Sequence, residues 1–160
     1  MPAVIDTSFW IAGYRAEVIA NCLDLFDIMV PDAVEVEIRG PSGPDTPLEY
    51  PYATLFRHLR GQLQSPPADA PARLPILGAG EAEAIALAQH LRVALLVNER
   101  RAVAYATGQG IPIVTVPGVI VVLCRTGVIS DRAARTKLAL LESITTARFI
   151  EDARRALDGL

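Results

Sequence analysis

Four acidic residues, Asp6, Glu37, Glu81 and Glu99, are the side chains best placed by type and context to do chemistry together. They come from four separate segments of the chain, and carboxylates that gather at one place repel one another unless a cation neutralises them. No histidine or cysteine accompanies them, and an all-oxygen ligand set suits Mg²⁺ or Mn²⁺ rather than zinc. The predicted chemistry is therefore the binding of a divalent cation.

The elements that must position these acids alternate between strands and helices. Strands are predicted over the apolar runs 3–5, 28–30, 94–97 and 113–115. Helices are predicted over residues 16–26, 31–39, 52–64, 81–91, 100–107, 119–125, 131–142 and 147–157. Because strands this apolar must be covered on both faces, the pattern predicts an α/β fold, a three-layer α/β/α sandwich with a central parallel sheet.

The carboxyl edge of such a sheet is where functional groups gather. Asp6 directly follows the first strand, and Asn98 and Glu99 directly follow the strand 94–97, so these residues are expected at one edge. A simpler interpretation also exists for both acids, since Asp6 fits as the N-cap of the next helix and Glu99 as a charge at a helix N-terminus. The sequence leaves both interpretations open.

Helical spacing separates each expected site acid from a neighbouring one. Glu81 and Glu83 are two residues apart, about 200° on a helix, so they cannot face one site together. Glu35 and Glu37 have the same spacing. Because Glu81 shares a stripe with Ile85 and Glu37 lies one turn beyond apolar residues, we expect these two to face inward and Glu83 and Glu35 to be solvated.

Length and composition limit the remaining possibilities. At 160 residues the chain is predicted to form a single domain over 1–160, with a proline-rich excursion over about 40–75 that holds eight of the twelve prolines. Cys22 and Cys124 sit in apolar contexts, as expected for buried, reduced cysteines. The N-terminus lacks the pattern of a signal peptide, and no apolar stretch reaches the roughly 20 residues that span a bilayer. We therefore expect a cytoplasmic protein with no membrane partner.

Several other chemistries lack their motifs. The sequence has no Walker loop, dinucleotide fingerprint or Gly-x-Ser-x-Gly elbow. A haloacid-dehalogenase-like phosphatase needs a second Asp two residues after the first, where this chain has Ser8. A response-regulator receiver needs a Lys after a late strand, and the only lysine, Lys137, falls in a late predicted helix.

Five segments, in order along the chain, resemble PIN-domain ribonucleases, in a prokaryotic branch related to VapC-type toxins. The segments are Val4-Ile5-Asp6-Thr7-Ser8, Val30-Pro31-Asp32-Ala33-Val34-Glu35-Val36-Glu37, Gly80-Glu81-Ala82-Glu83-Ala84-Ile85-Ala86-Leu87-Ala88, Leu95-Leu96-Val97-Asn98-Glu99-Arg100-Arg101-Ala102 and Pro112-Ile113-Val114-Thr115-Val116-Pro117-Gly118-Val119. They cover most of the chain apart from about 40–75, and their order is more specific than any one of them.

The resemblance implies a PIN fold and hydrolysis of RNA phosphodiester bonds that depends on Mg²⁺ or Mn²⁺. It assigns catalytic and metal-binding roles to the four acids, Asp6, Glu37, Glu81 and Glu99. It assigns contacts to substrate to three polar residues, Thr7, Ser8 and Asn98. It also implies the toxin role in a type II toxin–antitoxin pair, a cognate antitoxin protein as a partner, and a homodimer formed through the apolar helices near 16–26 and 119–125.

Asn98 departs from the pattern, because relatives in this branch usually read Asp-Asp or Asp-Glu where this chain has Asn98-Glu99. An amide brings no charge, which should weaken cation binding. The alternative function is therefore a catalytically weakened PIN-like module that acts by binding RNA or a protein. The formal net charge of −3 does not exclude an RNA partner, because without the four site acids the chain has 15 basic and 14 acidic residues.

Overall fold

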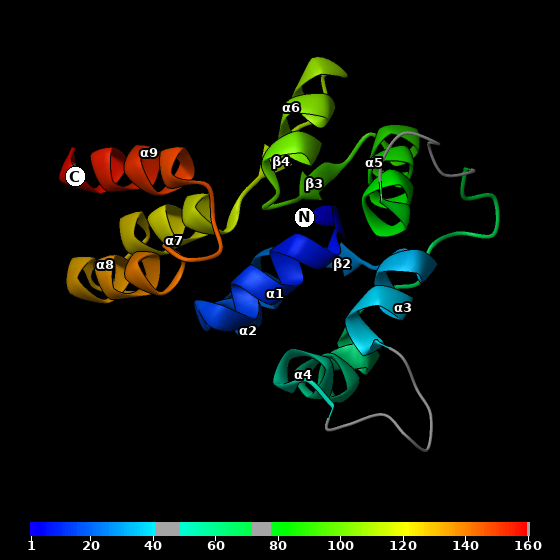
Figure 1. Cartoon of the computed structure of the whole chain (residues 1–160), viewed down its shortest axis with the longest axis horizontal. Helices are drawn as coiled ribbons and strands as arrows, with labels where there is room; N and C mark the ends of the chain where they lie inside the picture. Colours follow the sequence, from blue (N-terminus) through cyan, green and yellow to red (C-terminus); the bar gives the residue numbers. More distant parts are fainter. Residues whose placement is uncertain (41–48, 72–77, 160) are drawn as a thin grey trace.

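The computed structural model describes residues 1–40, 49–71 and 78–159. Its centre is a four-stranded parallel sheet in the order β2-β1-β3-β4 (Figure 1). The strands are β1 Pro2–Ile5, β2 Asp27–Met29, β3 Ala94–Leu96 and β4 Ile113–Val114. In the register of the sheet, Val4 pairs with Met29 on one side and with Leu95 on the other. The predicted α/β fold with a central parallel sheet flanked by helices is confirmed.

Helices surround this sheet. They are α1 Thr7–Arg15, α2 Ile19–Leu25, α3 Asp32–Arg39, α4 Pro51–Leu59, α5 Ala79–Leu91, α6 Arg100–Gly108, α7 Val116–Arg125, α8 Asp131–Leu140 and α9 Ala147–Asp158, with a 3₁₀ turn, η1, at Arg60–Gln62. Helix α5 packs on β1 and β3, and α3 packs on α5, whereas α7, α8 and α9 pack on one another. In Figure 1, α3 and α5 lie to the right of the sheet and α7, α8 and α9 to its left.

The helix predicted over 16–26 is wrong in its bounds, because helical structure already starts at Thr7 and falls into two pieces, α1 and α2. The chain turns between them at Glu17, which has a left-handed φ of 55°. Gly13 permits the close approach of the two helices, since a Cβ there would lie 2.7 Å from Ile19 Cδ1. The helix predicted over 52–64 likewise ends early, as α4 followed by η1.

The first helix anchors the described part of the proline-rich excursion. Trp10 is fully buried, and its ring meets that of Phe56 edge-on at a centroid distance of 5.1 Å. Its indole Nε1 donates to the carbonyl oxygen of Tyr52 at 2.9 Å. Other residues of the excursion, 41–48 and 72–75, lie outside the described residues, and the single-domain organisation stays a prediction.

The caps of the helices follow from local residue types. The hydroxyl of Thr115 accepts from the N–H of Gly118 at the start of α7, and that of Ser130 accepts from the N–H of Ala133 at the start of α8.

Across the described ranges, no helix combines the length and the apolar character needed to cross a membrane.

Candidate active site

The carboxyl ends of β1 and β3 meet at one edge of the sheet. The backbone N–H of Asp6 donates to the carbonyl oxygen of Leu96 at 3.0 Å, which places Asp6 beside the end of β3. The backbone N–H of Asn98 in turn donates to Ser8 Oγ at 3.0 Å. The expectation that Asp6 and the Asn98–Glu99 pair share this edge is therefore met by the geometry.

Asp6 is a buried acid, with 1% of its surface exposed. Its side chain caps α1 by accepting from the N–H of Phe9 at 2.8 Å, and both carboxylate oxygens lie 2.8 Å from Ser8 Oγ, which donates to them. Burial, together with the smaller effects of the charges of Glu81 and Glu37, raises the pKa of Asp6 from 3.8 to about 7, and the two hydrogen-bond donors oppose the rise. An acid in this position is stabilised by any cation that reaches it.

Glu37 reaches the same edge from α3. Its Oε2 accepts from the hydroxyl of Thr7 at 2.5 Å, and its Oε1 accepts from the backbone N–H of Gly80 at 2.8 Å. The carboxylate is thus held between the first turns of α1 and α5. A side chain at Gly80 would displace this carboxylate, because a Cβ there would lie 2.4 Å from Glu37 Oε2.

Glu81 stands in the first turn of α5, within electrostatic range of the other acids. Partial burial raises its pKa, and the charges of Glu99 and Glu37 raise it further. The backbone N–H of Gly78 and the guanidinium of Arg101 act in the opposite direction. The charges of Glu37 and Glu81 also act on Asp6, so Glu81 is within electrostatic range of each of the other three predicted acids, whereas Glu99 is shown in range of Glu81 alone.

Glu99 is the N-cap of α6, where its Oε2 accepts from the N–H groups of Arg101 at 2.6 Å and Ala102 at 2.9 Å. Asp6 caps α1 in the same manner. The interpretations that the sequence left open, an N-cap at Asp6 and a charge at a helix N-terminus at Glu99, are thus both confirmed. They do not compete with a site, because each cap lies at the carboxyl end of a strand.

The expectation that Glu35 and Glu83 are solvated is wrong, since both side chains are partly buried. The expected contrast with Glu37 and Glu81 is also wrong, because Glu37 is exposed and Glu81 is only partly buried. Glu83 Oε2 accepts from the backbone N–H of Ala33 at 2.6 Å, which gives this N–H group in the first turn of α3 a hydrogen-bond partner. Glu35 forms ion pairs with Arg39 at 2.7 Å and with Arg60 at 2.8 Å. The physical reason is that α4 and α5 both pack on α3, so that helix faces turned away from the site are covered as well.

The three polar residues expected to contact substrate make their hydrogen bonds within the protein. The hydroxyls of Thr7 and Ser8 donate to carboxylates of the site. Asn98 donates through Nδ2 to Thr145 Oγ1 at 2.8 Å, and its Oδ1 accepts from the N–H of Val116 at 3.4 Å. Contact of these residues with substrate stays a prediction. Sequence reasoning gave no signal for Thr145, which lies 47 residues from Asn98.

The four carboxylates fit a hard divalent cation by donor type. They are oxygen ligands accompanied by hydroxyls, and burial together with mutual repulsion makes a neutralising charge favourable at Asp6. Two of them, Asp6 and Glu99, are N-caps, and Glu37 accepts from the backbone N–H of Gly80 in the first turn of α5. Within residues 1–40, 49–71 and 78–159 no three His, Cys, Asp or Glu side chains are arranged closely enough to hold a metal ion. Cation binding at this edge would therefore draw on side chains that now serve helix N-termini.

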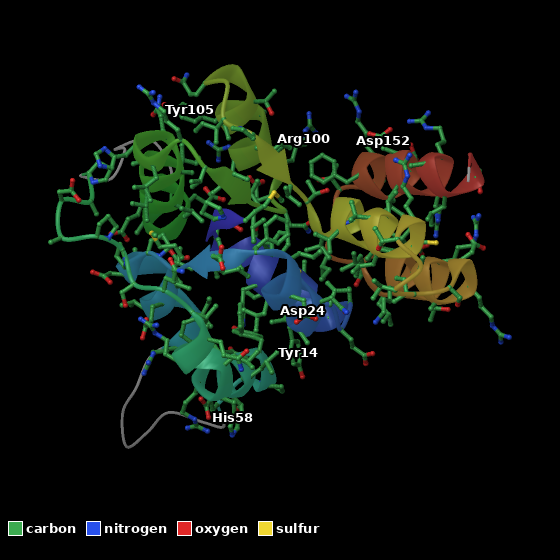
Figure 2. All side chains as sticks on the ribbon, turned by 180° about the vertical axis from the view of Figure 1, so that it is seen from behind. Tyr14, Asp24, His58, Arg100, Tyr105 and Asp152 are labelled. Atoms are coloured by element: carbon green, nitrogen blue, oxygen red, sulfur yellow. The ribbon has the colours of Figure 1, made fainter. Side chains whose placement is uncertain are left out.

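Two exposed arginines, Arg100 and Arg101, open α6 beside the acids. Neither forms an ion pair with an acid in the described part of the chain. Figure 2 shows Arg100 and, further along the same helix, Tyr105. Positive charge at a helix N-terminus is unfavourable for the isolated helix. Within the fold, the guanidinium of Arg101 lies close enough to Glu81 to oppose the rise of its pKa.

Comparison with known proteins identifies the family of the chain. The family model DUF3368, described as a PIN domain, matches residues 2–158. Among solved structures, a PilT N-terminus domain protein from the archaeon Sulfolobus solfataricus P2 is similar with a TM-score of 0.48 and 16% sequence identity, over 72% of this chain and 87% of that chain. No curated protein matches the chain.

Proposed function

Because the chain belongs to the PIN-domain family, we propose that it is a metal-dependent endoribonuclease that hydrolyses RNA phosphodiester bonds, and that it is the toxin of a type II toxin–antitoxin pair. The observation that carries the nuclease proposal is the buried carboxylate of Asp6 at the edge of the sheet, within charge range of Glu37 and Glu81. The toxin role rests on the family resemblance alone.

The residues that would hold Mg²⁺ or Mn²⁺ are Asp6, Glu37, Glu81 and Glu99. When bound, such an ion activates a water molecule and stabilises the charge that develops at the scissile phosphate. Ser8 orients the carboxylate of Asp6 by donating to both of its oxygens. The hydrogen bonds from Thr7 and Gly80 orient the carboxylate of Glu37 in the same way and hold it at the edge from which RNA would approach.

Contact with RNA is proposed at the start of α6. Arg100 and Arg101 are exposed, adjoin Glu99 and form no ion pair among the described residues, so their guanidinium groups suit phosphates on either side of the cleaved bond. The rest of the protein supplies little long-range attraction, since the whole chain has a formal net charge of −3. Binding would thus depend on these local contacts and on the metal.

Two protein partners are proposed from the resemblance. One is a cognate antitoxin that covers the site. The other is a second copy of this chain, bound through α2 and α7, whose outward side includes Val122 with 45% of its surface exposed. Size-exclusion chromatography with light scattering would test the second, and a monomer at micromolar concentration would contradict it.

An alternative candidate, a weakened PIN-like module that binds RNA or protein without cleavage, is favoured by one observation. Asn98 brings no charge, and its amide is already bonded to Thr145 and Val116. On this alternative, RNA binds and stays intact.

Cleavage of labelled single-stranded RNA separates the two functions. The purified protein with Mn²⁺ should cut the RNA, EDTA should stop the reaction, and Asp6→Asn should abolish it. Asp152→Asn is the matched control, because Asp152 is an exposed acid on α9 (Figure 2) and should leave the rate unchanged. Asn98→Asp restores the charge usual in this branch and is expected to increase the rate. Intact RNA with both the wild type and Asn98→Asp would overturn the nuclease proposal in favour of the alternative.

A further inference from the structure

Three polar residues are buried within the described part of the chain: Asp6, Asn98 and Thr145, which are 1%, 4% and 8% exposed. They come from the end of β1, the end of β3 and the turn between α8 and α9. Buried polar groups need hydrogen-bond partners. These three are joined to one another through a single further residue, Ser8.

The bonds form a continuous chain from the C-terminal helices to the site. Asn98 Nδ2 donates to Thr145 Oγ1 at 2.8 Å, and the backbone N–H of Asn98 donates to Ser8 Oγ at 3.0 Å. The hydroxyl of Ser8 then donates to the carboxylate of Asp6 at 2.8 Å. Thr145 is itself fixed, because its backbone N–H donates to the carbonyl oxygen of Leu141 at the end of α8 at 2.9 Å.

We propose that Thr145 is a positioning residue of the active site, which fixes the carboxylate of Asp6 through Asn98 and Ser8 and so makes the turn between α8 and α9 part of the site. This inference rests on the proposed nuclease function for its catalytic consequence. Its structural part, the coupling of Thr145 to Asp6, holds or fails by itself.

The physical basis is the satisfaction of a buried amide. The hydroxyl of Thr145 accepts the hydrogen bond of Asn98 Nδ2, and no buried side-chain donor or acceptor in the described residues lacks a partner. If the hydroxyl is removed, the amide must turn toward another acceptor or stay unpaired, and either change disturbs the segment that follows β3. Ser8 Oγ accepts from the backbone N–H of Asn98 in that segment, and the same hydroxyl donates to the carboxylate of Asp6. A shift of the segment would therefore move the hydroxyl that orients Asp6.

Thr145→Val tests the coupling, because valine keeps the shape of threonine and removes the hydroxyl. The matched control is Thr136→Val, since the Thr136 hydroxyl is exposed on α8 and donates to the carbonyl oxygen of Arg132 in its own helix. In a ¹H–¹⁵N spectrum without metal or RNA, the amide signal of Phe9, which donates to Asp6 Oδ1, should move in Thr145→Val and stay in place in Thr136→Val. An unmoved Phe9 signal in Thr145→Val would overturn the coupling, whatever the protein does to RNA.

The catalytic consequence has its own readouts. Substitution of a residue that hydrogen-bonds to a metal ligand and so orients it typically lowers activity or metal affinity by about 10- to 100-fold. We therefore expect Thr145→Val to lower kcat on single-stranded RNA, and the affinity for Mn²⁺, within that range, with KM changed less than about twofold. Thr145→Ser, which retains the hydroxyl, should restore most of kcat and of the Mn²⁺ affinity. Wild-type kcat and Mn²⁺ affinity in folded Thr145→Val would refute the positioning role.

A second variant covers the case in which Thr145→Val does not fold. Asn98→Leu combined with Thr145→Val replaces both partners by apolar groups of similar shape, which removes the unpaired amide. This double variant should fold and still show the lowered Mn²⁺ affinity and the displaced Phe9 signal. If it has the wild-type values of both, Thr145 does not position the site.

Discussion

Gly80→Ala tests whether the hydrogen bonds that hold the Glu37 carboxylate are needed for metal binding, with little change in the stability of the fold. The added Cβ would lie 2.4 Å from Oε2, 2.7 Å from Cδ and 2.9 Å from Oε1 of Glu37, so the two groups cannot keep their places. The side that yields is the carboxylate, since it is the end of a flexible side chain. Glu37 then loses the hydrogen bonds from the backbone N–H of Gly80 and from the hydroxyl of Thr7.

The expected change in the free energy of unfolding is small. A hydrogen bond to a charged group contributes about 1.5–3 kcal/mol, but Glu37 is exposed and water replaces part of the loss. Alanine in a helix is favoured over glycine by about 1 kcal/mol. We therefore expect a net loss below about 2 kcal/mol, which for a chain of this length lowers the melting temperature by less than about 8 °C.

The functional change should be much larger. Loss of the groups that orient a metal ligand typically lowers metal affinity by about 10- to 100-fold, measured here as Mn²⁺ binding by calorimetry. Gly108→Ala is the matched control, because it makes the same substitution at a helical glycine with nothing within 4 Å of the added Cβ. If Gly80→Ala binds Mn²⁺ and cuts RNA as the wild type does, the hydrogen bonds that hold the Glu37 carboxylate have no part in the site.

Three further perturbations have expected outcomes. Because the pKa of Asp6 is raised from 3.8 to about 7, protonated Asp6 should stabilise the metal-free fold by an amount that is fully present below about pH 4. This contribution, up to about 4 kcal/mol, should be lost as the pH rises through 7, and Asp6→Asn should remove it from the pH profile of urea unfolding. Lys137→Met removes the donor to two backbone carbonyls where α1 ends and should lower the free energy of unfolding by about 1–3 kcal/mol in the same assay; an unchanged value would mean that water replaces the ammonium group fully. Arg101→Gln should reduce the slope of log K against log salt for single-stranded RNA binding by about 0.7, whereas Arg132→Gln on α8 should leave the slope unchanged. If Arg101→Gln has the same slope as the wild type, Arg101 does not contact a phosphate.

The parts of the site that could be predicted from the sequence are those that depend on strand ends. Asp6 and Glu99 follow short apolar strands, and the parallel sheet then requires them at one edge, where the structure has them. The ordered segments that resemble PIN-domain ribonucleases predicted the family, which is confirmed over residues 2–158.

The parts that could not be predicted depend on contacts between distant segments. Helical spacing separated Glu37 from Glu35, but it could not show that Arg60, 25 residues away, lies beside Glu35 and removes it from solvent. The role of Asn98 has the same origin, because its partner Thr145 belongs to a turn that is remote in sequence.

The start of α1 at Thr7 could not be predicted from the sequence for a different reason. Its residues include aromatic and β-branched side chains and a glycine, Thr7-Ser8-Phe9-Trp10-Ile11-Ala12-Gly13-Tyr14-Arg15, which have modest helix propensity. Burial of Phe9 and Trp10 in the core stabilises the helix despite that propensity. The cap by Asp6 sets its first turn.

We propose that the four carboxylates at the edge of the sheet bind one or more divalent cations. The decisive measurement is the melting temperature of the wild type and of Asp6→Asn, each recorded against increasing Mn²⁺ in the same buffer. A ligand that binds only the folded state stabilises it by about 2.7 kcal/mol at 100 times its Kd. The wild type should therefore melt at progressively higher temperature, and Asp6→Asn should show no such rise. A wild-type melting curve that does not depend on Mn²⁺, or an equal rise in Asp6→Asn, would contradict the claim.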